Sequence, residues 1–125
     1  MTHEQLLAGE RILILDDEPI IVLDLVETLA RAGASTVTAR SSKGALRCLR
    51  DGHVSLALLD IRLGENDDCS AVCDELGRQR IPFVFLTGCA TAPRHWEHIP
   101  LLTKPARPSE VTNALSRTRQ PRHAA

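Results

Sequence analysis

Five short apolar stretches recur along the chain at intervals of roughly twenty residues. Runs of this kind suit strands that are buried on both faces of a sheet. We therefore predict strands over residues 11–15 (RILIL), 35–39 (STVTA), 54–59 (VSLALL), 82–86 (PFVFL) and 100–103 (PLLT).

The segments between these stretches are amphipathic, with apolar residues at helical spacing. The first is typical of a helix, because Pro19 suits its first turn and Gly33 follows its last residue. A third helix would be capped by Asp67 or Asp68, with its apolar face from Cys69 to Leu76 followed by Gly77 as a weak point before Pro82. We predict five helices, over residues 19–32, 42–51, about 69–76, 90–98 and about 108–117, the fourth of which is interrupted by a proline.

Strands that alternate with helices imply a parallel sheet with right-handed crossovers and helices on both faces. The predicted fold class is therefore α/β, a three-layer sandwich. The 125 residues, 43% hydrophobic and 25% charged, suit one folded domain and leave no room for a second one of ordinary size.

Composition also argues against several classes of protein. A net charge of −1 and only three aromatic residues are poorly suited to binding nucleic acid. No apolar run approaches the length of a membrane span, and residues 1–10 do not resemble a signal peptide. We therefore expect a cytoplasmic protein whose four cysteines (Cys48, Cys69, Cys73 and Cys89) are reduced thiols.

Polar residues follow the predicted strands at the point where each strand ends. In sheets of this class, ligands bind outside the carboxyl ends of the strands. If the first and third strands are neighbours, as in the flavodoxin-like order 2-1-3-4-5, three aspartates come within a few ångströms of one another. These strand-end residues are Asp16, Asp17 and Glu18 after the first strand, Asp60 after the third, Thr87 and Gly88 after the fourth, and Lys104 and Pro105 after the fifth.

Aspartates that lie so close together repel one another, and a divalent cation relieves the repulsion. An all-oxygen site of one or two carboxylates with water is the kind that Mg²⁺ prefers. With a hydroxyl from Thr87 and an ammonium from Lys104, such a site would surround an anion. The anion we favour is a phosphoryl group carried on Asp60, since aspartate is a covalent nucleophile in phosphoryl transfer.

The motifs ILDDEP, LALLDIRL, FVFLTG and LLTKP, in this order, resemble the receiver domain of two-component response regulators. The resemblance covers about residues 11–118 and leaves an N-terminal extension (residues 1–10) and a polar tail (119–125). It implies a CheY-like fold with Asp60 as the phosphoacceptor. It also implies that Asp16, Asp17, Asp60 and the backbone carbonyl of Arg62 hold Mg²⁺, which Mn²⁺ could replace, and that Thr87 and Lys104 bind the phosphoryl group.

The resemblance also implies partners. We expect a single-domain receiver that takes its phosphoryl group from a histidine kinase or phosphotransfer protein, without turnover of an external substrate. It would signal to an unknown protein target, without nucleic acid or membrane, as a monomer or weak dimer.

The sequence departs from the usual receiver pattern at several positions. Leu101 stands where receivers usually carry an inward-turning aromatic ring, and the stretch before Lys104 is short and contains Pro93. We therefore expect phosphorylation to act by ordering residues 88–98. Arg62 and Cys89 would border the path of attacking water. The stretch PFVFLTG also resembles a Pro-Phe-x-Phe-x-Thr-Gly subgroup of stand-alone receivers in alphaproteobacteria.

Three other functions stay open. A receiver-like scaffold that is never phosphorylated would fit the missing aromatic ring at Leu101. A haloacid-dehalogenase-type phosphohydrolase also uses an aspartate after a parallel strand, but Arg62 stands where that class needs a second aspartate. A flavin carrier of the same fold would need a phosphate loop rich in Ser, Thr and Gly, whereas this loop is acidic.

Overall fold

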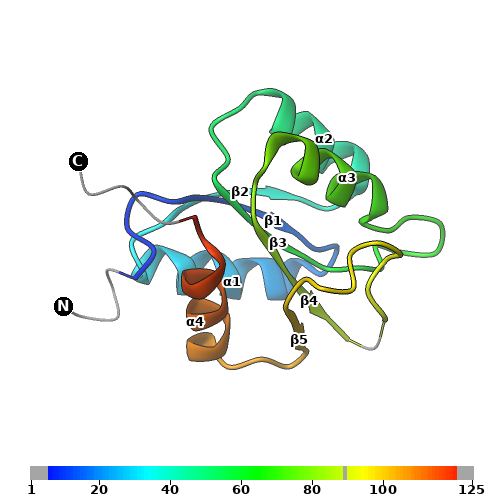
Figure 1. The fold of residues 1–125 in the computed structure, drawn as a ribbon. Coiled ribbons are helices and arrows are strands. Elements are labelled where there is room, and N and C mark those ends of the chain that lie inside the picture. The colour runs from blue at the N-terminus through cyan, green and yellow to red at the C-terminus, as the bar shows by residue number, and fades with distance from the viewer. Residues whose placement is uncertain (1–5, 89, 121–125) are drawn as a thin grey trace.

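A computed structural model of the chain describes residues 6–88 and 90–120. Five strands and four helices alternate along most of this range (Figure 1). The elements are β1 (Arg11–Leu15), α1 (Pro19–Arg31), β2 (Ser35–Ala39), α2 (Ser42–Arg50), β3 (Leu56–Leu59), α3 (Ser70–Gln79), β4 (Phe83–Thr87), β5 (Leu101–Thr103) and α4 (Pro108–Thr118).

All neighbouring strands of the sheet are parallel, in the order β2-β1-β3-β4-β5. This order confirms the predicted flavodoxin-like, CheY-like fold. The strands β1, β3 and β4 are central, and almost every residue in them is buried. One exposed face would have required polar residues at alternate positions, so the continuous apolar runs are explained by helices on both sides.

Helices α2 and α3 cover one face of the sheet, and α1 and α4 cover the other (Figure 1). Alternate side chains of each strand therefore enter different cores. On β1, Leu13 and Leu15 point to α2 and α3, while Ile12 and Ile14 point to α1 and α4. The second core also takes in Leu7, which is fully buried and whose N–H bonds the carbonyl of Ala32 at 2.9 Å.

The helix predicted over residues 90–98 is wrong for the residues that the structure describes. In place of a helix, turns close between Pro93 and Trp96 and between Trp96 and Ile99. Pro93 removes one helical donor, and His95 adopts a left-handed backbone with φ of 78°. The apolar residues of this segment therefore cover the sheet through loop packing.

Trp96 anchors this segment to the neighbouring helix. Its indole lies edge-on to Phe83, with 5.4 Å between ring centroids, and its Nε1 donates to the carboxylate of Asp74 at 3.1 Å. A Cβ atom at Gly77 would come within 2.6 Å of the indole. Gly77, which the sequence suggested as a weak point, thus leaves room for the indole of Trp96. Helix α3 continues through it to Gln79.

The start of α3 also differs in detail from the prediction. Cys69 occupies the N-cap, and the Asp68 carboxylate accepts from the N–H of Ser70 at 2.9 Å. The Asp67 carboxylate instead accepts from the N–H and hydroxyl of Ser42 at 2.9 and 2.6 Å. Asp67 therefore ties the loop after β3 to the first residue of α2.

The three cysteines in the described residues, Cys48, Cys69 and Cys73, are free. The last two are fully buried, with their sulfur atoms 3.8 Å apart. The contact with Cys69, together with burial, raises the pKa of the Cys73 thiol well above its usual range. In the described part of the chain, no helix is both long and apolar enough to cross a bilayer.

Candidate functional site

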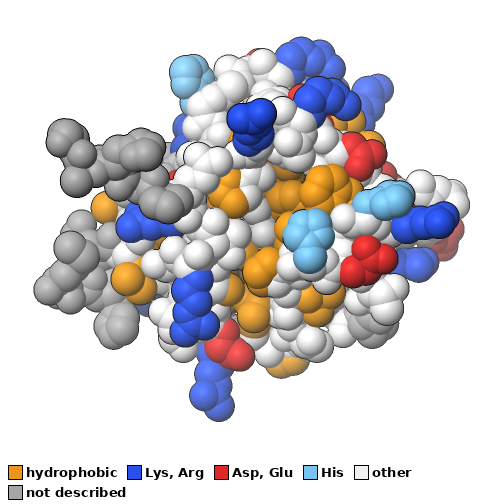
Figure 2. All heavy atoms as spheres, viewed as in Figure 1, with side chains coloured by type: hydrophobic (Ala, Val, Ile, Leu, Met, Phe, Trp, Pro, Cys, Tyr) orange, Lys and Arg blue, Asp and Glu red, His pale blue; other side chains and the backbone are white. Residues whose placement is uncertain are grey.

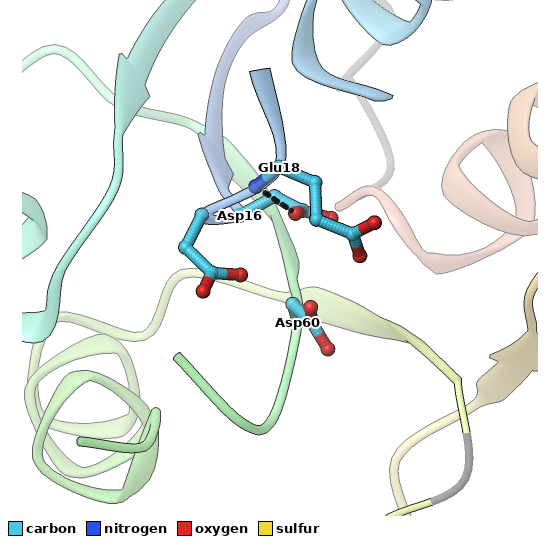
Figure 3. Close-up of side chains that lie close together, drawn as sticks. Asp16, Glu18 and Asp60 are labelled. Carbon is cyan, nitrogen blue, oxygen red and sulfur yellow. Dashed lines mark hydrogen bonds between the residues drawn. The ribbon is translucent and has the colours of Figure 1, made fainter. Parts of the chain in front are cut away.

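Four carboxylates gather at the carboxyl ends of β1 and β3. Each of Asp16, Asp17, Glu18 and Asp60 offers an oxygen, and these oxygens all lie within 4.8 Å of one another. Figure 3 shows the side chains of Asp16, Glu18 and Asp60 close together, the first two from the loop after β1 and the third from the end of β3. The sequence prediction of an acidic cluster at this edge is confirmed.

The pairing of the two strands brings these residues to one level. Leu15 of β1 lies opposite Leu59 of β3, so the aspartates that follow them are neighbours. The N–H of Asp60 bonds the carbonyl of Leu15 at 2.8 Å, and the N–H of Asp16 bonds the carbonyl of Ala39 at 3.1 Å. The backbone of both aspartates is therefore fixed by the sheet.

A single ammonium group lies among the carboxylates. The Nζ atom of Lys104 is 2.9 Å from Asp16, 2.8 Å from Glu18 and 2.9 Å from Asp60. Only 12% of the lysine side chain is exposed, and Asp16 and Asp60 are buried. Ion pairs among buried groups are screened much less than those at the surface, so the lysine is strongly held.

These contacts shift the ionisation of both partners. Burial raises the pKa of Asp16 above its usual value of 3.8, although the hydrogen bond from Lys104 opposes the rise. Burial alone would lower the pKa of Lys104, but hydrogen bonds to Glu18, Asp16 and Asp60 raise it above its usual 10.5. Lys104 therefore remains charged at neutral pH.

Both oxygens of the Asp60 carboxylate have a donor. One accepts from the N–H of Ile61 at 2.8 Å, and the other accepts from Lys104 at 2.9 Å. These two bonds fix the plane of the carboxylate at the carboxyl edge of the sheet. A carboxylate in a fixed orientation is preorganised for attack on an incoming electrophile.

Thr87 and Lys104 lie on adjacent strand ends, as predicted. The N–H of Lys104 bonds the carbonyl of Thr87 at 2.8 Å, and Thr87 pairs with Thr103 across the sheet. Thr87 is buried, at the end of β4. Leu101 of β5, which pairs with Phe85 of β4, is 39% exposed.

The remaining predicted residues lie beside the site. The Arg62 side chain is exposed and lines a cavity of about 830 Å³ between the loop after β3 and the segment that includes Thr91 and Pro93. The metal-binding role of its carbonyl and the effect of its side chain on attacking water stay predictions. Cys89 lies outside the described residues.

Glu18 is the one residue of the cluster to which the sequence prediction gave no role. It precedes Pro19 and is the N-cap of α1, and its side chain leaves the helix to reach Lys104. The available signal was its place in the strand-end series after β1, directly after the two aspartates.

Comparison with known proteins settles the family. The family model for the response regulator receiver domain matches residues 12–116. The chain belongs to this family. The prediction of a receiver domain from the strand-end motifs is thereby confirmed. Membership of the Pro-Phe-x-Phe-x-Thr-Gly subgroup stays a prediction.

Several solved receivers resemble this one. SdrG from Sphingomonas melonis Fr1 is 33% identical with a TM-score of 0.77, and the match covers 86% of this chain and 93% of SdrG. A receiver protein from Sinorhizobium medicae WSM419 is 27% identical with a TM-score of 0.76, over 86% and 92% of the two chains. The receiver domain of PhyR from Erythrobacter litoralis is 27% identical with a TM-score of 0.77, over 94% and 98%. A comparison with curated proteins found no match.

Proposed function

We propose that this receiver accepts a phosphoryl group on Asp60 from the phosphohistidine of a histidine kinase or phosphotransfer protein. The observation that carries the proposal is the oriented carboxylate of Asp60, which shares the ammonium of Lys104 with Asp16 at the carboxyl edge of the sheet. An Asp60 oxygen attacks phosphorus in line. The P–N bond breaks, and its electron pair returns to the imidazole of the donor.

The charges at the site support a metal requirement. Four carboxylates face a single ammonium in the described part of this edge, which is unfavourable for an incoming phosphoryl dianion. The oxygens of these carboxylates suit a hard divalent cation, which would add to the single positive charge of Lys104. We propose that Asp16, Asp17, Asp60 and the carbonyl of Arg62 hold Mg²⁺ or Mn²⁺. A bound Mg²⁺ supplies charge neutralisation at the phosphoryl oxygens.

Lys104 has two uses in this proposal. Before transfer it neutralises the buried Asp16 and Asp60, and afterwards it pairs with the phosphoryl oxygens. Thr87, bonded to Lys104 through the backbone, lies at the adjacent strand end, from which its hydroxyl would donate to the same group. The phosphoryl group would thus pull β4 and β5 toward Asp60.

The site lies next to exposed apolar side chains that fit a protein donor. Ile20 is 81% exposed and Leu23 is 70% exposed, in the first turns of α1 directly after Glu18. A protein that presents phosphohistidine to Asp60 must lie over this edge of the sheet. We therefore propose that the phosphodonor packs against Ile20 and Leu23 during transfer.

The signal would leave the site through the segment after β4. Thr87 ends β4, and residues 90–98 are held on the sheet by Trp96 and by the partly buried Ala90 and Ala92. We propose that recruitment of Thr87 orders this segment. Hydrogen exchange with and without beryllofluoride and Mg²⁺ tests this step, and unchanged protection over residues 90–98 would contradict it.

Intact mass measurement tests phosphorylation itself. The wild type, incubated with acetyl phosphate and Mg²⁺, should gain one phosphoryl group, and the gain should be lost in Asp60→Asn or with EDTA. The matched control is Asp24→Asn, an exposed aspartate on α1. If the wild type gains no mass even with its cognate kinase, the chain is a scaffold.

A further inference from the structure

We propose that the exposed face of α2 is a docking surface for an acidic helix of a partner protein. Arg40, just before α2, and Lys43, Arg47 and Arg50 within it are all exposed. Residues 32–50 include these four cations and no Asp or Glu. We call these four side chains the α2 basic face. In Figure 2, Lys and Arg side chains gather at the top of the molecule, where Figure 1 places α2.

The α2 basic face has no carboxylate partner among the ion pairs of the described residues. By contrast, Arg31, Arg78 and Arg119 each have one. Helix α2 packs against α3, whose Glu75 is engaged by Arg78 and Gln79. Unpaired cations of one sign on one helix face attract a polyanion or an acidic protein surface.

The spacing of the cations favours a helix as the partner. Lys43, Arg47 and Arg50 are at positions i, i+4 and i+7, which fall on one side of α2 over about 10 Å of its axis. Carboxylates at the same spacing on a second helix would lie opposite them. The α2 basic face therefore specifies both the sign of the partner's charges and their spacing along its helix.

Two other anionic partners fit less well. Nucleic acid binding gains from stacking, but α2 has no aromatic residue and the whole chain has a net charge of −1. A membrane surface would require large apolar side chains beside the cations. In the described part of the chain, the large exposed apolar residues are Ile20, Leu23 and Leu101, none of which is on α2.

The α2 basic face is also linked to the carboxyl edge of the sheet. Asp67, in the loop that follows Asp60, holds the N–H and hydroxyl of Ser42 at the first turn of α2. A partner on this face would therefore contact a helix whose start is bonded to the loop after β3. The docking proposal itself does not depend on phosphorylation.

An NMR titration of the ¹⁵N-labelled full chain tests the proposal. The probe is an alanine-rich helical peptide with Glu at i, i+4 and i+7, and its control has Gln at those positions. At low ionic strength we expect the Glu peptide to shift the amides of residues 40–50 most, and added salt to weaken binding. Equal shifts with the Gln peptide, or shifts that lie elsewhere, would overturn the proposal.

Two variants and two competitors sharpen the test. The triple variant Lys43→Gln, Arg47→Gln, Arg50→Gln should weaken binding about tenfold, because three exposed ion pairs are lost. Its matched control, Arg80→Gln, Arg94→Gln, Arg117→Gln, removes the same charge from exposed positions elsewhere and should bind normally.

The charge-reversed variant Lys43→Glu, Arg47→Glu, Arg50→Glu should bind a peptide with Lys at the three positions, which a merely unfolded variant would not do. Larger shifts with duplex DNA or phosphatidylglycerol vesicles than with the Glu peptide would overturn the assignment of the partner.

Discussion

The ammonium of Lys104 lies 2.8 Å from the carboxylate of Glu18, and this contact joins the loop before α4 to the loop before α1. The same ammonium contacts Asp16 and Asp60, which are far less exposed than Glu18. The three contacts are therefore unequal. The pair with the exposed Glu18 is screened by water, while the buried aspartates depend on Lys104 for a counter-charge.

Removal of this lysine should cost much more stability than removal of Glu18. We expect Lys104→Met to lower the free energy of unfolding by about 3 kcal/mol without Mg²⁺, because two buried carboxylates lose their cation. Glu18→Gln should cost less than about 1 kcal/mol. Urea unfolding measures both. Lys43→Met, at the other lysine of the chain, is the control and should change little.

Asp16 gives a prediction about pH. Its folded pKa is above 3.8, so the folded state binds more protons than the unfolded state in the window above pH 3.8. Stability contributed by this group is therefore lost as the pH rises through that window. Without Mg²⁺, Asp16→Asn should be more stable than the wild type at pH 7, by a few degrees in Tm.

The difference should disappear as the pH falls to 3.8, and Mg²⁺ should stabilise the wild type more than the variant. An equal Tm at pH 7 in EDTA would contradict the prediction.

The bonds between Asp67 and Ser42 should be worth more than an ordinary helix cap. Asp67→Ala removes two hydrogen bonds and a carboxylate from the start of α2, and we expect a loss of about 2 kcal/mol. Asp68→Ala, which removes one bond to Ser70, is the matched control and should cost about half as much. Denaturant unfolding that ranks the two variants the other way would show that the link to α2 is weak.

Gly77 should be intolerant of a side chain despite its place in a helix. Alanine normally improves a helix by about 1 kcal/mol over glycine. Here its Cβ would lie 2.6 Å from the indole of Trp96, so Gly77→Ala should displace the indole and shift its fluorescence to the red. Gly44→Ala, in α2, meets no part of Trp96 and should leave the emission unchanged.

Substitution in the apolar pair on α1, Ile20 and Leu23, should affect a protein phosphodonor but not a small-molecule one. Leu23→Asp should slow phosphotransfer from a phosphohistidine protein by about tenfold, because a charge enters the proposed contact. Phosphorylation by acetyl phosphate, which needs no docking surface, should be unchanged. Thr28→Asp, a control further along the same helix, should leave both rates unchanged. Equal loss with both donors would indicate damage to Asp60 or its surroundings.

The parts of this fold that follow from local pattern were predictable. Continuous apolar runs on β1, β3 and β4 require helices on both faces, and a parallel sheet of this order brings Asp16 and Asp60 together. The role of Glu18 was not predictable in this way. Its contact joins residues that are 86 positions apart, and no local pattern specifies where a long exposed side chain points.

The prediction of a helix in the segment after β4 is wrong for a different reason. The pattern of its apolar residues predicts one face of a helix, but apolar residues in a loop can also cover a sheet. Tertiary contacts decide between a helix and a loop here. The indole of Trp96 packs against Gly77 and donates a hydrogen bond to Asp74. The information about this packing lies on α3, about twenty residues earlier in the sequence.

The described residues between β4 and β5 form no helix, and this changes how we expect the molecule to open. A helix would protect this crossover with a ladder of backbone hydrogen bonds, whereas its described residues 90–99 are held by two turns, the Trp96 indole and other partly buried apolar side chains. Segments with few protected amides exchange and are cleaved at a lower free energy than global unfolding. We therefore expect residues 90–99 to open at a lower free energy than the rest of the sheet, while β1 and β3 keep the carboxylate cluster intact.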